Sequence, residues 1–104
     1  MNHGLPSATV ARMRAAFDRY PGVEKAVLYG SRAKGNYKPG SDIDLTLVGE
    51  GLTSAQLGSI ADELDDLLLP YKIDLSLFGQ IGSPELRAHI ERVGQIFYER
   101  TGRA

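Results

Sequence analysis

Apolar residues recur every three or four positions in three segments of the chain, at about residues 7–20, 53–69 and 83–93. Each segment begins at a hydroxyl side chain that can cap a first turn, and each ends before a proline or glycine, which stop helices. The candidate caps are Ser7, either Thr53 or Ser54, and Ser83. The pattern therefore predicts three helices that each bury one apolar stripe.

Shorter apolar segments between these helices have the pattern of strands. Residues 25–29 are mostly apolar and lie between glycines, as in a buried strand, and residues 95–98 form a last apolar segment. Residues 41–47 and 71–78 alternate between apolar and polar, so each strand has one face toward the core and one open face. Helices that alternate with about four short strands predict an α+β domain, a small sheet with helices packed on it.

The two alternating strands carry aspartates on their open faces. Both contain the triplet Ile-Asp-Leu, at residues 43–45 and 73–75. If isoleucine and leucine point inward from both strands, Asp44 and Asp74 face the same side. Asp42 lies on that face as well, about 6.5–7 Å from Asp44 along the strand. Three carboxylates converge if the two strands are neighbours in a suitable register.

Carboxylates that converge repel one another, and a cation removes that repulsion. Mg²⁺ prefers oxygen ligands, and commonly takes a few carboxylates together with water and substrate phosphate. Two such ions about 3.5–4 Å apart can stabilise both the attacking and the leaving oxygen of a phosphoryl displacement. We therefore interpret Asp42, Asp44 and Asp74 as candidate ligands of magnesium, with two ions expected.

A glycine-containing basic segment precedes the first two aspartates. Gly30 permits close approach of the backbone to a triphosphate, and Ser31 offers a hydroxyl and amides at the start of a short helical turn. Arg32, Lys34 and Lys38 add positive charge, and Arg32 has the geometry for a bidentate phosphate contact. The segment is thus a candidate nucleotide-binding turn.

Composition excludes several other classes of function. The 104 residues fit one domain, with residues 1–6 as a flexible end, and the net charge of −1 argues against binding of long nucleic acid. The absence of cysteine excludes disulfides, thiol catalysis and cysteine-ligated zinc. No apolar run has the length of a signal peptide core or of a membrane span, so we expect a cytoplasmic protein with no membrane partner.

Together these motifs resemble a known family. Gly30-Ser31, then ten residues, then Asp42-x-Asp44, with Asp74 on a later strand, resembles the DNA polymerase beta-like nucleotidyltransferase superfamily. The small size and the sequences GSRAKG at 30–35 and SDIDL at 41–45 are similar to the minimal nucleotidyltransferases, the MntA-type antitoxins. The resemblance implies their α+β fold, a two-layer sandwich with a small mixed sheet of about four strands.

The resemblance also implies roles for individual residues. It assigns triphosphate binding to Gly30 and Ser31, metal binding to Asp42 and Asp44, and to Asp74 a third metal-ligand position that also serves as base toward the incoming hydroxyl. Lys34 stands where relatives often carry arginine, so only a weak phosphate contact is implied there. The implied reaction is transfer of AMP from ATP to a tyrosine of a helical HEPN-domain toxin, which makes the protein an antitoxin.

Two other functions stay open at this point: a non-catalytic antitoxin that occludes its partner, and a transferase that modifies a small-molecule hydroxyl. Taken alone, Gly30-Ser31 is an ordinary strand-to-helix turn and each aspartate an ordinary surface acid, but their combined spacing favours a site. His3 and His89 lack metal-ligand spacing. We expect packing or surface roles for the remaining candidates, which are Tyr29, Tyr37, Arg87, Arg92, Arg100 and Arg103.

Overall fold

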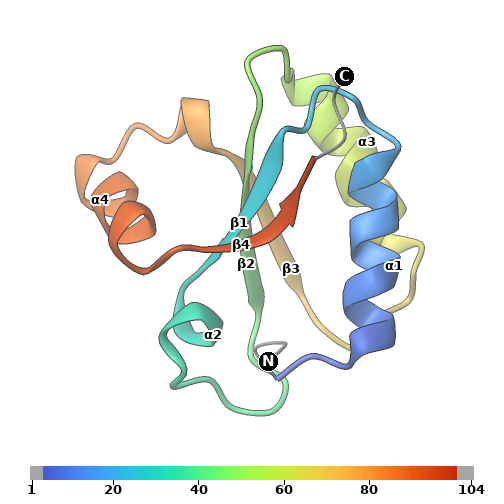
Figure 1. Ribbon diagram of the computed structural model, residues 1–104, viewed down its shortest axis with the longest axis vertical. Helices are drawn as coiled ribbons and strands as arrows, with labels where there is room; N and C mark the ends of the chain where they lie inside the picture. Colours follow the sequence, from blue (N-terminus) through green and yellow to red (C-terminus); the bar gives the residue numbers. More distant parts are fainter. Residues whose placement is uncertain (1–3, 101–104) are drawn as a thin grey trace.

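The computed structural model describes residues 4–100 (Figure 1). In chain order, its elements are α1 (Ser7–Asp18), β1 (Lys25–Tyr29), α2 (Ser31–Lys34), β2 (Ile43–Val48), α3 (Ser54–Asp65), β3 (Ile73–Leu77), the 3₁₀ turn η1 (Phe78–Gln80), α4 (Pro84–Val93) and β4 (Gln95–Glu99). Every helix and strand predicted from the pattern is present.

The four strands form one mixed sheet in the order β3-β2-β1-β4. β1 pairs antiparallel with both β2 and β4, whereas β2 and β3 are parallel and are joined through α3. The α+β class with a small four-stranded mixed sheet is therefore confirmed. In this order β1 and β2 are central, and β3 and β4 are the two edge strands.

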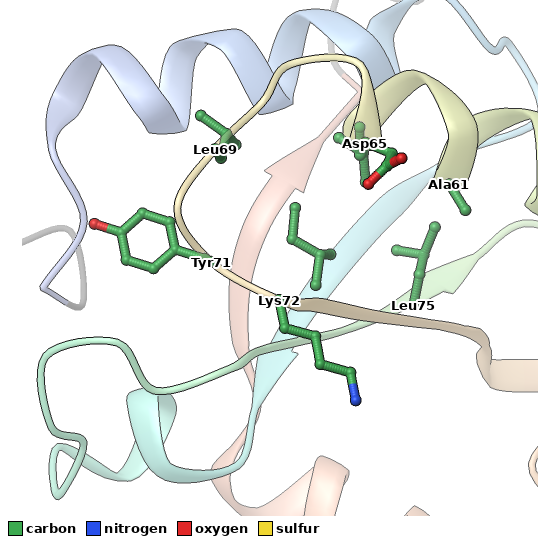
Figure 2. Close-up of a pocket in the computed structure, with 8 residues that line it drawn as sticks. Ala61, Asp65, Leu69, Tyr71, Lys72 and Leu75 are labelled. Carbon is green, nitrogen blue, oxygen red and sulfur yellow. The ribbon is translucent and has the colours of Figure 1, made fainter.

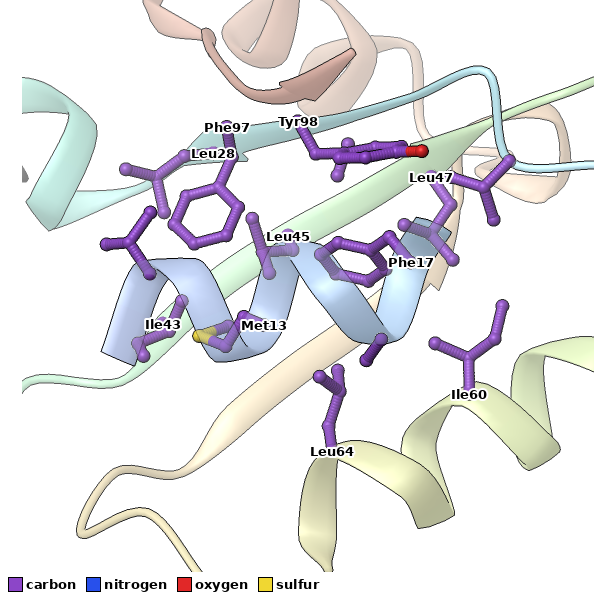
Figure 3. Packing of buried hydrophobic residues seen from close by; sticks show 14 of the residues in the cluster. Met13, Phe17, Leu28, Ile43, Leu45, Leu47, Ile60, Leu64, Phe97 and Tyr98 are labelled. Atoms are coloured by element: carbon purple, nitrogen blue, oxygen red, sulfur yellow. The ribbon is translucent and has the colours of Figure 1, made fainter. Parts of the chain in front are cut away.

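The core lies between one face of the sheet and the pair α1 and α3 (Figure 3). Phe17 is fully buried at its centre and meets Phe97 edge to face, with ring centroids 6.4 Å apart. α4 lies on the opposite side of the sheet (Figure 1), where it packs against β1 and buries Ile90 outside the main core cluster. The two predicted layers are thus α1 with α3 and the sheet, and α4 covers part of the second face.

The start of the chain differs in two respects from the expectation. Pro6 occupies the N-cap position of α1, so Ser7 is the first helical residue and its predicted capping role is wrong. Proline suits this position because its fixed φ matches the extended cap conformation and it has no amide to satisfy. Leu5, expected in a flexible end, is buried in the core; His3 lies outside the described residues.

α3 begins as expected and ends earlier than expected. Thr53 caps it through a reciprocal capping box with Gln56. The helix ends at Asp65 rather than near Pro70, because the proline ring would clash with the carbonyl four residues earlier and excludes helical geometry at the preceding residue. Leu68, placed by the pattern in the buried stripe, has φ +57° and is 88% exposed.

Arg100 ties the end of β4 to the end of α1. Its guanidinium donates to the carbonyl oxygens of Val23 and Tyr20 at 3.0 and 2.8 Å, and to those of Phe17 and Asp18 at 3.3 and 3.4 Å. The surface role expected for Arg100 is therefore wrong, since the side chain binds backbone carbonyls at the end of α1 and in the turn that follows it. Within residues 4–100, no helix has the length and apolar character needed to cross a membrane.

Candidate active site

Asp44 and Asp74 lie side by side on neighbouring parallel strands. The register pairs Ile43 with Ile73, Asp44 with Asp74, and Leu45 with Leu75. Ile43 and Leu45 are fully buried, so the two aspartates point to the opposite, α4 side of the sheet. Neighbouring strands are about 4.7–4.9 Å apart, which brings the two carboxylates within direct electrostatic range. The repeated Ile-Asp-Leu triplet thus produces a carboxylate pair.

Gly30 forms the wall beside this pair. The residue directly before it, Tyr29, pairs with Asp44 across the antiparallel ladder. Gly30 has φ +76° and ψ −155°, a conformation essentially restricted to glycine. A Cβ atom at this position would lie 2.3 Å from Oδ2 of Asp44. The glycine is therefore required both by the backbone and by the position of the carboxylate.

The Asp44 carboxyl group has an unfavourable environment for a negative charge. Burial raises its pKa, the charges of Asp74 and Asp42 raise it further, and His89 on α4 lowers it. Repulsion of this kind is what a bound cation relieves. Because the donors are all carboxylate oxygens on one face of the sheet, the residues present fit a hard divalent cation such as Mg²⁺.

Asp42 occupies a different position from the other two aspartates. It is exposed and precedes β2, next to a turn in which the Ser41 amide donates to the Lys38 carbonyl. Among residues 4–100, no group of three or more histidine, aspartate or glutamate side chains is arranged to hold a metal ion. The structure thus brings Asp44 and Asp74 together and leaves Asp42 close enough only for its charge to affect Asp44.

The predicted nucleotide-binding turn is formed by β1 and α2. Gly30 takes the N-cap position, so the first amides of α2, beginning at Ser31, have no partner within the helix. Because α2 has only four residues, its dipole adds little, and any anion binding there depends on these amides and on the Ser31 hydroxyl. Lys34 is exposed in the last turn of α2.

Arg32 is buried, in contrast to the solvent-facing position that a phosphate contact requires. The side chain is 2% exposed, and its guanidinium donates twice to the Ser41 carbonyl, at 2.9 and 3.2 Å. It also lies over the rings of Tyr37 and Tyr71, at 5.1 and 5.2 Å from their centroids. These contacts fasten the loop that leads to Asp42, and the phosphate contact of Arg32 stays a prediction that requires this loop to open.

Two residues to which the sequence assigns no part in the site, His89 and Tyr29, lie near the carboxylates. His89 of α4 meets the Tyr29 ring edge to face at 6.3 Å, and its charge reaches Asp44. Burial raises the pKa of the Tyr29 hydroxyl, a hydrogen bond with Ser76 opposes the shift, and Asp74 and Asp44 add to it. No local pattern connects α4 with β1, so only the tertiary fold reveals this aromatic wall.

The face that carries the aspartates is open only at one end. Thr46, expected on the open face beside Asp44, is fully buried, and its hydroxyl accepts from the Ser76 hydroxyl at 3.0 Å. The reason is that η1 packs against β2 and α4 against β1 on this side of the sheet (Figure 1). The end of the face that stays open is therefore the end where Asp44, Asp74 and Gly30 meet.

A glycine turn beside paired carboxylates on a mixed sheet is an arrangement suited to phosphoryl transfer. The polymerase beta nucleotidyltransferase family model matches residues 12–103, and the chain belongs to this family. It is thus a nucleotidyltransferase. No curated protein sequence matches the chain closely enough to add to this assignment.

Solved structures share the fold at low sequence identity. A chain of a toxin–antitoxin crystal structure with AMP-PNP is 21% identical, with a TM-score of 0.69 over 92% of this chain and 75% of that one. A chain of the MntA–HepT toxin–antitoxin crystal structure is 18% identical, with a TM-score of 0.67 over 91% of this chain and 74% of that one. A chain from the structure of the tri-AMPylated Shewanella oneidensis HEPN toxin in complex with MNT antitoxin is 18% identical, with a TM-score of 0.65 over 89% of this chain and 71% of that one. At these identities the likeness establishes the fold.

Proposed function

We propose that this protein is a magnesium-dependent adenylyltransferase that moves AMP from ATP onto a tyrosine hydroxyl of a HEPN-type toxin and thereby acts as its antitoxin in the cytoplasm. The observation that carries the proposal is the pairing of Asp44 with Asp74 beside Gly30, where a Cβ atom would displace the Asp44 carboxylate. Its support comes from family membership and from the shared fold with toxin–antitoxin complexes, of which one contains AMP-PNP and another an AMPylated toxin.

Asp44 and Asp74 are the residues that hold the cation, and Asp42 joins them from the start of β2. When bound, magnesium neutralises the negative charge of the carboxylates and of the triphosphate, and we expect two ions. Asp44 is fixed for this task because it is half-buried between Gly30 and Asp74. Asp42 is exposed, so it can approach from solvent without disturbing the core.

The turn at the start of α2 binds the triphosphate of ATP. Gly30 leaves space for close approach, and Ser31 offers a hydroxyl together with amides that have no helical partner. Lys34 adds a point charge from the exposed side of α2. Arg32 holds the following loop through Ser41, so its own phosphate contact would depend on movement of that loop.

The reaction is an in-line displacement at the α-phosphorus of ATP. The acceptor hydroxyl oxygen forms a bond to the α-phosphorus, and the bond from that phosphorus to the oxygen bridging to the β-phosphate breaks, which releases pyrophosphate. Asp74 is the base that takes the hydroxyl proton, since it is exposed on the edge strand and stands beside Asp44. AMP is then joined to the acceptor as a phosphodiester.

Labelled ATP tests this proposal directly. The purified protein, Mg²⁺ and the HEPN-type protein encoded beside its gene are incubated with ATP labelled at the α-phosphate, and label on the partner is measured. We expect transfer by the native protein and by Asp66→Asn, an exposed acid of the α3 end, and a loss of at least about 100-fold in Asp44→Asn and Asp74→Asn. Equal transfer by all four proteins refutes the assigned roles.

Two further arms separate the alternative functions. If a variant with Asp42, Asp44 and Asp74 all replaced by asparagine still protects cells from the toxin, occlusion of the partner is sufficient and transfer is secondary. If label appears on a small hydroxyl compound rather than on the protein partner, the acceptor is a small molecule.

A further inference from the structure

β3 is an edge strand and carries Asp74, so the active site extends to an open border of the sheet. The Ile43 amide donates to the Lys72 carbonyl at 2.9 Å. Backbone groups of successive residues in a strand point in alternate directions, so Lys72, Asp74 and Ser76 face β2. The amide and carbonyl groups of Ile73 and Leu75 and the amide of Leu77 therefore face outward, whereas the Leu77 carbonyl belongs to the N-cap of η1.

The two edge strands of the sheet differ in how far side chains cover their outward-facing backbone groups. On β4, the Phe97 carbonyl is covered by Arg14, whose Nε donates to it at 2.8 Å, and the pairing with β1 contains an irregularity at Ala26–Val27. Such devices protect edge strands from pairing with other chains. β3 pairs in a regular register, and within residues 4–100 no side chain hydrogen bonds to its outward-facing groups. The edge beside the active site is the unprotected one.

A pocket with a mixed polar and apolar lining opens beside this edge, on the core face of the sheet (Figure 2). It lies between the C-terminal half of α3 and β3. Its apolar lining includes Leu64, Leu69, Ile73 and Leu75, and its polar lining includes Asp65, Tyr71 and Lys72. With a volume of about 180 Å³, the pocket can receive one side chain from a segment placed along β3, with an apolar body against the leucines and isoleucine.

We propose that the β3 edge docks an extended segment of the acceptor protein as an additional strand, and that this pairing presents the acceptor hydroxyl to Asp74. The inference rests on the proposed function and names how its substrate is recognised. The segment gains backbone hydrogen bonds from Ile73, Leu75 and Leu77, the usual source of affinity in strand addition. The occupant is the acceptor because the strand it pairs with holds the base of the reaction.

Strand alternation defines the chemistry of this segment. Residues that face the Asp44 and Asp74 side lie about 4.7–4.9 Å from β3, within side-chain reach of the carboxylates. The residues directly before and after them face the other side, toward the pocket of Leu64, Leu69, Ile73 and Leu75. A modified tyrosine with an apolar neighbour in the sequence, in an extended segment, is the substrate that fits.

Amide hydrogen exchange in the β3 strand tests the docking. Exchange is measured by NMR for the isolated protein and for its mixture with the HEPN-type partner, Mg²⁺ and AMP-PNP. The amides of Ile73, Leu75 and Leu77 should exchange rapidly in the isolated protein and at least about 10-fold more slowly in the mixture. The amides of Asp74 and Ser76, already bonded to β2, should change little. Unchanged exchange at all three outward amides in a mixture that transfers AMP overturns the proposal.

A variant that fills the pocket supplies the second test. Ala61 lines the pocket from α3, and Ser59 is exposed two residues earlier, on the other side of the helix. Ala61→Trp should raise the KM for the protein acceptor at least about 10-fold without changing AMP-PNP binding, and Ser59→Trp should leave both unchanged. Equal KM values for the two variants overturn the proposal.

The same experiments separate this inference from the function on which it rests. If the native protein transfers no AMP to the partner, yet the three outward amides become protected on mixing, docking stands and the proposed reaction is wrong. If these amides are already protected in concentrated solutions of the isolated protein, and dilution removes the protection, the edge pairs with a second copy of this chain and the docking proposal is wrong.

Discussion

Gly30 offers the sharpest perturbation of the site, because the structure assigns it two separate requirements. Replacement by alanine places a Cβ atom in a backbone conformation with φ +76° and ψ −155°. The same Cβ would lie 2.3 Å from Oδ2 of Asp44, so the carboxylate must move. Gly35→Ala is the matched control, since Gly35 also has a positive φ, of +87°, but open space around its Cβ position.

The expected loss of stability in Gly30→Ala has a backbone-strain part and a steric part from Asp44. A residue held in a glycine-only region costs about 1–3 kcal/mol, and a domain of this size loses about 4–8 °C of Tm per kcal/mol. Gly30→Ala should therefore lower the Tm by about 4–24 °C from strain alone. The left-handed conformation costs Gly35→Ala about 1–2 kcal/mol, with no steric addition. Only Gly30→Ala should also abolish AMP transfer.

A double-mutant cycle isolates the steric term. Thermal unfolding in EDTA is followed for Gly30→Ala, Asp44→Ala and the combination, and removal of the Asp44 carboxylate should recover part of the cost of Gly30→Ala. The control pair Gly35→Ala with Asp44→Ala should be additive within about 0.5 kcal/mol. If Gly30 and Asp44 are also additive, the contact between them does not constrain the site, and the reasoning is refuted.

Three further predictions concern charges. Asp44→Asn should raise the Tm of the metal-free protein at pH 7 by a few degrees, because burial disfavours the Asp44 charge and like charges directly opposite on neighbouring strands cost up to about 1 kcal/mol. The raised pKa of Asp44 means that this cost is present when the carboxylate is ionised and is lost as pH falls through the folded-state pKa, so melting curves at pH 3 should show no gain. Arg100→Ala should lower the free energy of unfolding, measured in urea, by about 1.5–3 kcal/mol, because the charge-assisted hydrogen bonds to four carbonyls are lost. Arg32→Lys keeps the charge but not the stacking or the paired bonds to Ser41, and should cost about 1–3 kcal/mol in the same assay.

Each of these predictions has an outcome that contradicts it. A Tm gain for Asp44→Asn that persists at pH 3 would show that the charge of Asp44 is not its source. Arg92→Ala, at an exposed position of α4, is the control for Arg100→Ala and should change stability by less than about 0.5 kcal/mol. An Arg32→Lys protein of native stability that binds AMP-PNP poorly would assign Arg32 to phosphate rather than to the loop.

The sequence predicts the carboxylate pair because the relevant signals are local. The alternation of apolar and polar residues places Asp44 and Asp74 on the face away from the buried isoleucines and leucines. The sequence leaves the strand register open, and the in-register parallel pairing of the triplets at 43–45 and 73–75 is a finding of the structure. The sequence also marks Gly30 as the glycine of a strand-to-helix turn, but the close approach of Gly30 to Asp44 follows from the pairing of β1 with β2. Period and turn chemistry are properties of short segments.

The parts that the sequence does not predict depend on contacts between distant segments. Arg32 and Arg100 read as surface or phosphate-binding cations, and their buried carbonyl contacts follow only from how loops and helix ends meet. The leucines after Asp65 continue a helical period, yet Pro70 restricts the backbone before it, and Leu68 is exposed. His89 reaches the site from α4, and no spacing in the sequence links it to Tyr29.

Mass spectrometry of the partner together with a pyrophosphate assay tests the central claim most directly. With ATP and Mg²⁺, the native protein should add whole AMP units to a tyrosine of the HEPN-type protein and release one pyrophosphate for each unit, and EDTA should stop both. Asp44→Asn and Asp74→Asn should add none, while Asp66→Asn behaves as the native protein. An unmodified partner in all samples, or modification that survives loss of both Asp44 and Asp74, contradicts the account.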